Sequence, residues 1–281
     1  MKITLGFSPC PNDTFIFDAL VNNKIDTWGI NFVPKLEDVE TLNNRAINNT
    51  LDITKISFGV LPLVFNNYIV LNSGSALGTG VGPILIAKNK ILINEIDNCV
   101  ISIPGEHTTA HMLFNIAFPL AKNKIFIRYD EVENFVLQTP SYNIAGVIIH
   151  ENRFTYAQKG LNKIIDLGEF WQNETGYPIP LGGIVAKRQL DNSVLKKIDL
   201  LIKQSIEYAF TDYPLISPYV KMHAQEMDEQ VIRKHIELYV NDYSFSLGEE
   251  GKNAVKEFLK INQNMKELNN KSEYEIFLSN L

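Results

Sequence analysis

The chain has 281 residues, of which 45% are hydrophobic, so it is long enough for two domains with buried cores of their own. Its 26 basic and 32 acidic residues give a formal net charge of −6, and no basic tract is dense enough to follow a nucleic-acid backbone. No apolar run approaches the length of a membrane span. We therefore expect neither nucleic acid nor a membrane as a partner.

The N-terminal segment and the two cysteines indicate where the protein works. Gly6, Pro9 and Pro11 interrupt the N-terminus before the apolar core of a signal peptide could develop. Cys10 and Cys99 lie far apart, which favours two free thiols over a disulfide. We expect a cytoplasmic protein.

Short β-rich runs alternate with amphipathic segments in the first half of the chain, a pattern typical of parallel sheets flanked by helices. In chain order we expect strands at 3–7, 30–34, 53–57, 69–71, 100–103, 125–129 and 144–150. Helices are expected from Phe15 onward, after N-caps among 12–14, and at 39–47 and 110–120. After Arg188 the pattern becomes helical, with helices expected at 194–210, 228–239 and 250–259.

Two similar segments, Gly82 to Lys88 and Gly182 to Lys187, each join glycine to a short β-branched run that ends in Ala-Lys. Paired extended segments of this kind suit connections that let one lobe rotate on another. The sequence therefore predicts an α/β protein of two lobes with a cleft between them. The first lobe would comprise residues 1–86 and 187–281, and residues 87–186 would form an inserted second lobe.

The stretch from Ser8 to Phe15 joins a predicted strand to a predicted helix. Open α/β sheets gather ligands at the carboxyl ends of their strands, and the backbone N–H groups of a helix start attract anions. Asn12 and Asp13 are therefore candidate substrate-binding residues. The alternative for this stretch is an ordinary capped turn.

Two further pairs of side chains are candidates for binding a carboxylate. Lys55 and Ser57 alternate along one strand and share a face, where Lys55 would supply a positive charge, although an exposed strand lysine is the plainer alternative. Thr108 and Thr109 place two hydroxyls at a helix start, where they could bind an anion or simply cap the helix.

His150 ends an apolar strand at 144–150, the position at which a general base would point toward a ligand. The alternative is a hydrogen-bonded histidine that caps the strand. His107 and His111 have the spacing of two metal ligands on one helix, but no carboxylate or cysteine cluster completes a shell, so no metal site is expected. Cys10 has no histidine beside it in sequence and is a weak candidate nucleophile.

Several long stretches together resemble the 1,4-dihydroxy-6-naphthoate synthase family, lyases of the futalosine route to menaquinone. The resemblance spans most of the chain and is more specific than any single motif above. The stretches are SPCPNDTFIF from Ser8, LEDVETLN from Leu36, TKISF from Thr54, SGSALGTGVGP from Ser73, PGEHTTA from Pro104, IIHENRFTY from Ile148 and NDYSFSLGEEG from Asn241.

The resemblance implies a periplasmic-binding-protein-like fold of type II that performs catalysis without a metal or an organic cofactor. It also implies a small carboxylate substrate, cyclic de-hypoxanthine futalosine, with His150 as the catalytic base and Thr108 and Thr109 lining the pocket. Two alternatives stay open at this point. One is a small-anion solute-binding protein of a transport system, for which a signal or lipoprotein peptide would be expected, and the other is the related chorismate dehydratase activity.

Overall fold

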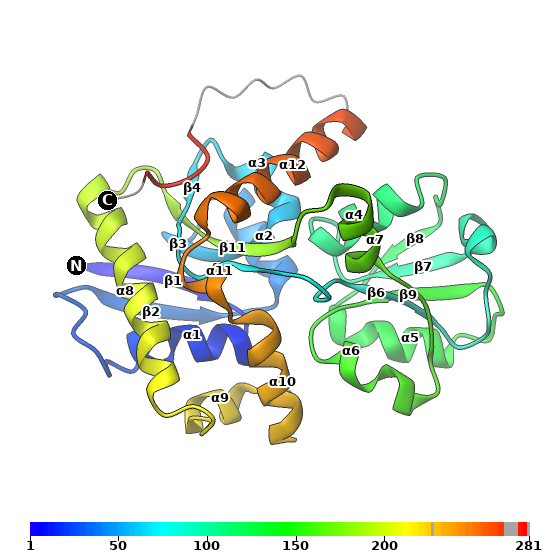
Figure 1. Cartoon of the computed structure of the whole chain (residues 1–281), viewed down its shortest axis with the longest axis horizontal. Coiled ribbons are helices and arrows are strands. Elements are labelled where there is room, and N and C mark those ends of the chain that lie inside the picture. The colour runs from blue at the N-terminus through cyan, green and yellow to red at the C-terminus, as the bar shows by residue number, and fades with distance from the viewer. Residues whose placement is uncertain (226–227, 267–274, 280–281) are drawn as a thin grey trace. The chain divides into compact units, whose positions relative to one another are not determined.

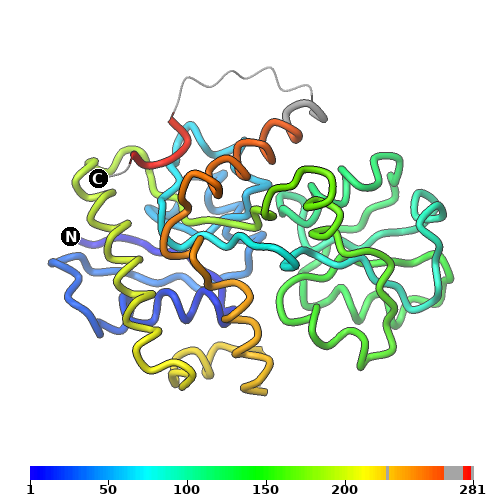
Figure 2. Tube along the Cα trace, viewed as in Figure 1, coloured from blue at the N-terminus to red at the C-terminus, as the bar shows by residue number. Residues whose placement is uncertain are grey.

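A computed structural model describes residues 1–225, 228–266 and 275–279 (Figures 1 and 2). The chain divides into two compact α/β units, of which the first comprises Met1–Gly78 and Pro180–Leu281 and the second comprises Thr79–Ile179. Within the described residues, no helix combines the length and the apolar character needed to cross a membrane.

The first unit contains a sheet of six strands with the order β2-β1-β3-β11-β4, and β5 pairs with β11 beside this path. β1 is parallel to β2 and β3, whereas β11 runs antiparallel to β3 and β4. The strands are β1 (Lys2–Phe7), β2 (Asn31–Leu36), β3 (Ile53–Ser57), β4 (Tyr68–Val70), β5 (Ala76–Gly78) and β11 (Ile179–Lys187).

Helices pack on both faces of this sheet, and every residue of its central strand β3 is buried. Ile3, Leu5 and Phe7 of β1 belong to a core cluster shared with α1, which packs against α8, α9 and α10 (Figure 1). A Cβ added to Gly6 would lie 2.9 Å from Leu42, so α2 approaches the opposite face. The helices are α1 (Pro11–Val21), α2 (Val39–Ile47), α3 (Leu61–Val64), α8 (Asn192–Thr211), α9 (Pro218–His223), α10 (Glu229–Tyr239), α11 (Asp242–Phe245) and α12 (Gly248–Lys266).

The second unit contains a five-stranded sheet with the order β10-β6-β9-β7-β8. β7 is parallel to its neighbours β9 and β8, whereas β6 is antiparallel to its neighbours β10 and β9. Val132 and Val136 of α5 pack on one face, where a Cβ at Gly146 would meet them at 2.7 and 2.8 Å. The elements are β6 (Ile84–Ala87), β7 (Val100–Ile103), β8 (Lys124–Phe126), β9 (Ile144–Ile148), β10 (Asn162–Asp166), α4 (Thr109–Ala117), α5 (Val132–Gln138), α6 (Asn152–Thr155) and α7 (Leu167–Thr175).

The unit boundaries differ from those expected from the sequence, which were 1–86 with 187–281 for the first lobe and 87–186 for the second. The chain changes unit after Gly78 and again after Ile179. The two segments interpreted as connections are instead strands, because β6 pairs with β9 and β10 in the second sheet and β11 pairs with β3 and β4 in the first. A short buried apolar run suits an interior strand as well as it suits an extended connection.

Most other elements lie near their expected positions. The strands at 53–57 and 100–103 and the helix at 39–47 have the expected bounds. α1 begins at Pro11 with Cys10 as its N-cap, four residues before the expected start, because proline at the first helical position needs no N–H partner. The strand expected at 125–129 covers Lys124–Phe126, and a 3₁₀ turn begins at Tyr129.

Candidate active site

Asp13 lies in the first turn of α1 and is almost fully buried, with 2% of its surface exposed. Its Oδ2 accepts hydrogen bonds from the Ser8 backbone N–H at 3.1 Å and the Ser8 hydroxyl at 2.8 Å. Its Oδ1 accepts from Asn12 Nδ2 at 2.9 Å and lies 3.1 Å from Lys55 Nζ. Four donors fill the acceptor positions of a carboxylate, so this side chain fastens the turn after β1 to β3.

Lys55 and Ser57 lie on the same face of β3, as their alternation along the strand predicted, and both are buried. β3 lies between β1 and β11, so Lys55 is not an exposed strand lysine. Its ammonium also donates to the Gly74 carbonyl at 3.2 Å, which together with Asp13 occupies two of its three N–H donors. Within the described part of the chain, the Ser57 hydroxyl makes no hydrogen bond, although its backbone N–H donates to Asn43 Oδ1 at 2.9 Å.

Asn12 is 5% exposed, and its Oδ1 lies 2.9 Å from Nε2 of His235 in α10. Sequence reasoning did not identify His235. The available signal was a histidine among the buried Ile232, Ile236 and Tyr239 of an amphipathic helix, which is more often an ordinary core position.

In the second unit, Thr108 is the N-cap of α4. Its hydroxyl oxygen accepts from the His111 N–H at 3.2 Å, which is the capping arrangement considered from the sequence, and its O–H donates to the Gly105 carbonyl at 2.9 Å. Thr109 is the first residue of α4 and is 3% exposed. His111 Nδ1 lies 2.7 Å from the Glu106 carbonyl oxygen and must therefore carry the proton.

His150 follows the carboxyl end of β9 by two residues and has a left-handed backbone with φ of +57°. A non-glycine residue seldom adopts this conformation, and such strain is concentrated at functional sites. The half-buried imidazole meets the Tyr129 ring edge-on, with centroids 5.1 Å apart. Glu151 and Asn152, both buried, follow it and lead into α6. The imidazole thus lies in the turn directly beyond the carboxyl end of β9, in contact with the Tyr129 ring.

Arg153 fastens the segment that follows His150. Its guanidinium donates to the Gly82 carbonyl, to the Gly80 carbonyl at 2.8 Å and to Asp166 Oδ2 at 3.1 Å. A Cβ at Gly82 would lie 2.3 Å from the backbone of Gly168, so both glycines are needed for this close approach.

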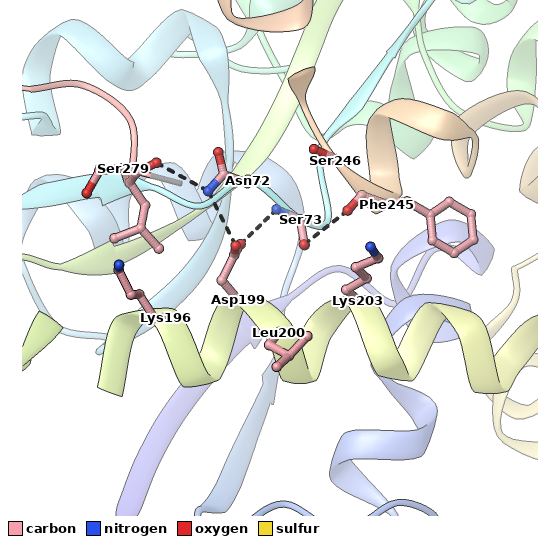
Figure 3. Close-up of a pocket in the computed structure, with 10 residues that line it drawn as sticks. Asn72, Ser73, Lys196, Asp199, Leu200, Lys203, Phe245, Ser246 and Ser279 are labelled. Carbon is pink, nitrogen blue, oxygen red and sulfur yellow. Dashed lines mark hydrogen bonds between the residues drawn. The ribbon is translucent and has the colours of Figure 1, made fainter. Parts of the chain in front are cut away.

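A pocket of about 180 Å³ lies elsewhere in the first unit, between α8 and the segment after β4 (Figure 3). Asp199 lies at its centre and accepts from the Ser73 N–H at 2.9 Å and from Asn72 Nδ2 at 3.4 Å, and burial raises the pKa of this carboxyl. Lys196 and Lys203 line the same pocket, but the predicted site residues do not. These contacts anchor the segment that carries Gly74.

Solved structures resemble the chain across nearly its whole length. A crystal structure of a protein from Archaeoglobus fulgidus is 30% identical, with a TM-score of 0.87 over 95% of this chain and 98% of that one. The alkanesulfonate-binding protein of Xanthomonas axonopodis pv. citri is 9% identical, with a TM-score of 0.70 over 96% and 94% of the two chains. The expected periplasmic-binding-protein-like fold is thereby confirmed.

Curated relatives are named 1,4-dihydroxy-6-naphthoate synthase. The one from Thermus thermophilus is 41% identical over 90% of this chain and 91% of its own length. The one from Streptomyces coelicolor is 36% identical over 92% of this chain and 91% of its own length. The profile of a family described as menaquinone biosynthesis matches residues 3–264. The resemblance noted in the sequence is confirmed, and the chain belongs to the menaquinone biosynthesis family.

Proposed function

We propose that this protein is a 1,4-dihydroxy-6-naphthoate synthase, a carbon–carbon lyase that acts on cyclic de-hypoxanthine futalosine. The observation that carries the proposal is the 41% identity, over nine-tenths of both chains, to a relative of that name. The reaction is expected to run in the cytoplasm and without an added metal or organic cofactor, as the family resemblance implies.

In this proposal His150 is the general base. It removes the proton of a hydroxyl on the sugar-derived ring, and the resulting alkoxide becomes a carbonyl as the adjacent carbon–carbon bond breaks. The bonding electron pair passes to the bicyclic ketone as an enolate, which takes up a proton from the protonated His150 and tautomerises to the aromatic diol. The electrons balance without an oxidant or a reductant. A strand-end imidazole with a constrained backbone supports this role, since a base must be held in place to be effective.

The substrate's carboxylate and developing oxyanion need hydrogen-bond donors. In the first unit we assign this task to the Ser57 hydroxyl and to the remaining N–H of Lys55, with Asn12 and Asp13 holding that lysine and its turn in place. In the second unit we assign it to Thr109, while Thr108 fixes the start of α4.

Incubating the purified protein with cyclic de-hypoxanthine futalosine, in buffer containing a chelator, tests the activity directly. We expect the naphthoate product to appear in mass spectrometry. Binding of the substrate without turnover would refute the lyase and would favour a solute receptor.

Replacing His150 tests the assigned base. His150→Asn is the sharper variant because asparagine tolerates the left-handed backbone but cannot act as a base near neutral pH, and His150→Ala complements it. Both are expected to fold, to bind product and to lose about 10²- to 10⁴-fold in single-turnover rate. Near-normal turnover in these variants, together with collapse in His107→Ala, would transfer the role to His107.

A further inference from the structure

His235 is fully buried in α10 and contacts Asn12, which lies 223 positions earlier in the sequence. Its Nε2 lies 2.9 Å from Asn12 Oδ1, so α10 supplies one side of the turn that begins α1. Burying an imidazole costs free energy unless its polar atoms are hydrogen-bonded. A leucine would fill the apolar face of α10 without that cost, so packing alone does not account for a histidine here.

The direction of each hydrogen bond in this contact follows from the chemistry of the groups. The Asp13 carboxylate, held by the Lys55 ammonium, can only accept, so the Asn12 atom 2.9 Å from it must be the amide Nδ2. The amide oxygen of Asn12 then faces His235 and can only accept as well. Nε2 of His235 therefore carries the proton and donates it to this bond.

The contact begins a series of hydrogen bonds that ends at the proposed substrate ligands. His235 donates to Asn12, Asn12 donates to Asp13, and Asp13 binds the ammonium of Lys55 at 3.1 Å. The other carboxylate oxygen of Asp13 accepts two bonds from Ser8. Without its partner on α10, the Asn12 amide would lose one of the two contacts, to His235 and to Asp13, that hold it in place beside Lys55.

We propose that His235 is a positioning residue for the reaction, which acts by orienting the Asn12 amide and, through Asp13, the ammonium of Lys55. This inference rests on the proposed function, because the benefit of a fixed Lys55 is a substrate anion bound in the productive geometry. His235 itself is too deeply buried to serve as a substrate ligand.

Kinetics of substituted proteins test the inference. His235→Leu removes the donor, His235→Gln keeps an N–H donor on a side chain of similar reach, and Ile236→Val is a control that trims a buried neighbour on α10. We expect His235→Leu to lose roughly 5- to 10-fold in kcat/KM, the range for one lost hydrogen bond, mainly through a higher KM. His235→Gln should recover most of this loss, and Ile236→Val should match the wild type.

A double substitution separates positioning from general loosening of the fold. If His235 acts through Asn12, His235→Leu should have little further effect on kcat/KM in an Asn12→Ala background. Additive losses, or a His235→Leu protein that is no slower than Ile236→Val, would overturn the inference. Lack of turnover in the wild-type protein would instead refute the proposed function.

The protonation of His235 can be observed without any variant and without turnover. Long-range ¹H–¹⁵N spectra of the wild-type protein, with His235 assigned, distinguish the two ring nitrogens. A proton on Nε2 is expected. A neutral ring protonated only at Nδ1 would contradict the hydrogen bond to Asn12 and with it the proposal.

Discussion

Replacing Lys55 by methionine should destabilise the first unit far more than loss of an exposed ion pair would. The ammonium and the Asp13 carboxylate are 3.1 Å apart, with 7% and 2% of their side chains exposed. Removing one partner leaves a buried charge uncompensated, which costs about 3–5 kcal/mol. The unit has about 180 residues, so its unfolding entropy is about 0.4 kcal/mol per kelvin and the melting temperature should fall by about 8–12 °C.

Urea denaturation and thermal melting followed by circular dichroism measure this loss. Lys24→Met is the matched control, because Lys24 pairs with Asp18 at 2.7 Å but is 31% exposed, and its loss should cost about 1 kcal/mol or less. The double variant Lys55→Met with Asp13→Asn should be more stable than Lys55→Met alone, since no buried charge remains. A Lys55→Met protein within 1 kcal/mol of the Lys24→Met protein would refute the reasoning.

Three further predictions concern stability and reactivity. Gly82→Ala, whose Cβ would lie 2.3 Å from Gly168, should lose about 1–3 kcal/mol in thermal melts, and an unchanged melting temperature would contradict the close approach. Burial raises the pKa of Asp52, but hydrogen bonds from Thr4 and the neighbouring ammonium of Lys187 together lower it below its usual value. The stabilisation from Asp52 is therefore present above about pH 4 and lost below it, so the difference in melting temperature between wild type and Asp52→Asn should shrink in acid. Cys99 is 1% exposed, and burial also raises the pKa of its thiol, so mass spectrometry should show iodoacetamide labelling Cys99 more slowly in native than in unfolded protein.

Local sequence patterns predicted those features that depend on neighbouring residues. The alternation along β3 placed Lys55 and Ser57 on one face, and the apolar spacing at 39–47 gave the bounds of α2. The end of an apolar run predicted His150 as the last residue of a strand, and the strand ends two residues earlier, at Ile148. Each of these signals is contained within about ten residues of the chain.

Features that depend on distant partners were not predictable in the same way. The ion pair between Asp13 and Lys55 and the contact between Asn12 and His235 join segments that nothing in the local pattern brings together. The segment Gly182 to Lys187 was interpreted as a connection because it resembles the segment Gly82 to Lys88, and the local pattern does not reveal that it pairs with β3 and β4. A Cβ at Gly182 would lie 2.5 Å from the Ile56 carbonyl oxygen of β3.

The place of β11 inside the first sheet has a consequence for synthesis on the ribosome. β3 and β4 are both translated before the second unit, yet β11, the strand that joins them in the sheet, is translated after it. At about 5–20 residues per second, the hundred intervening residues take roughly 5–20 s to emerge. During that interval the edge of β3 has no partner, and unpaired edges invite aggregation. The nascent chain should therefore need a chaperone most between the appearance of β4 and that of β11.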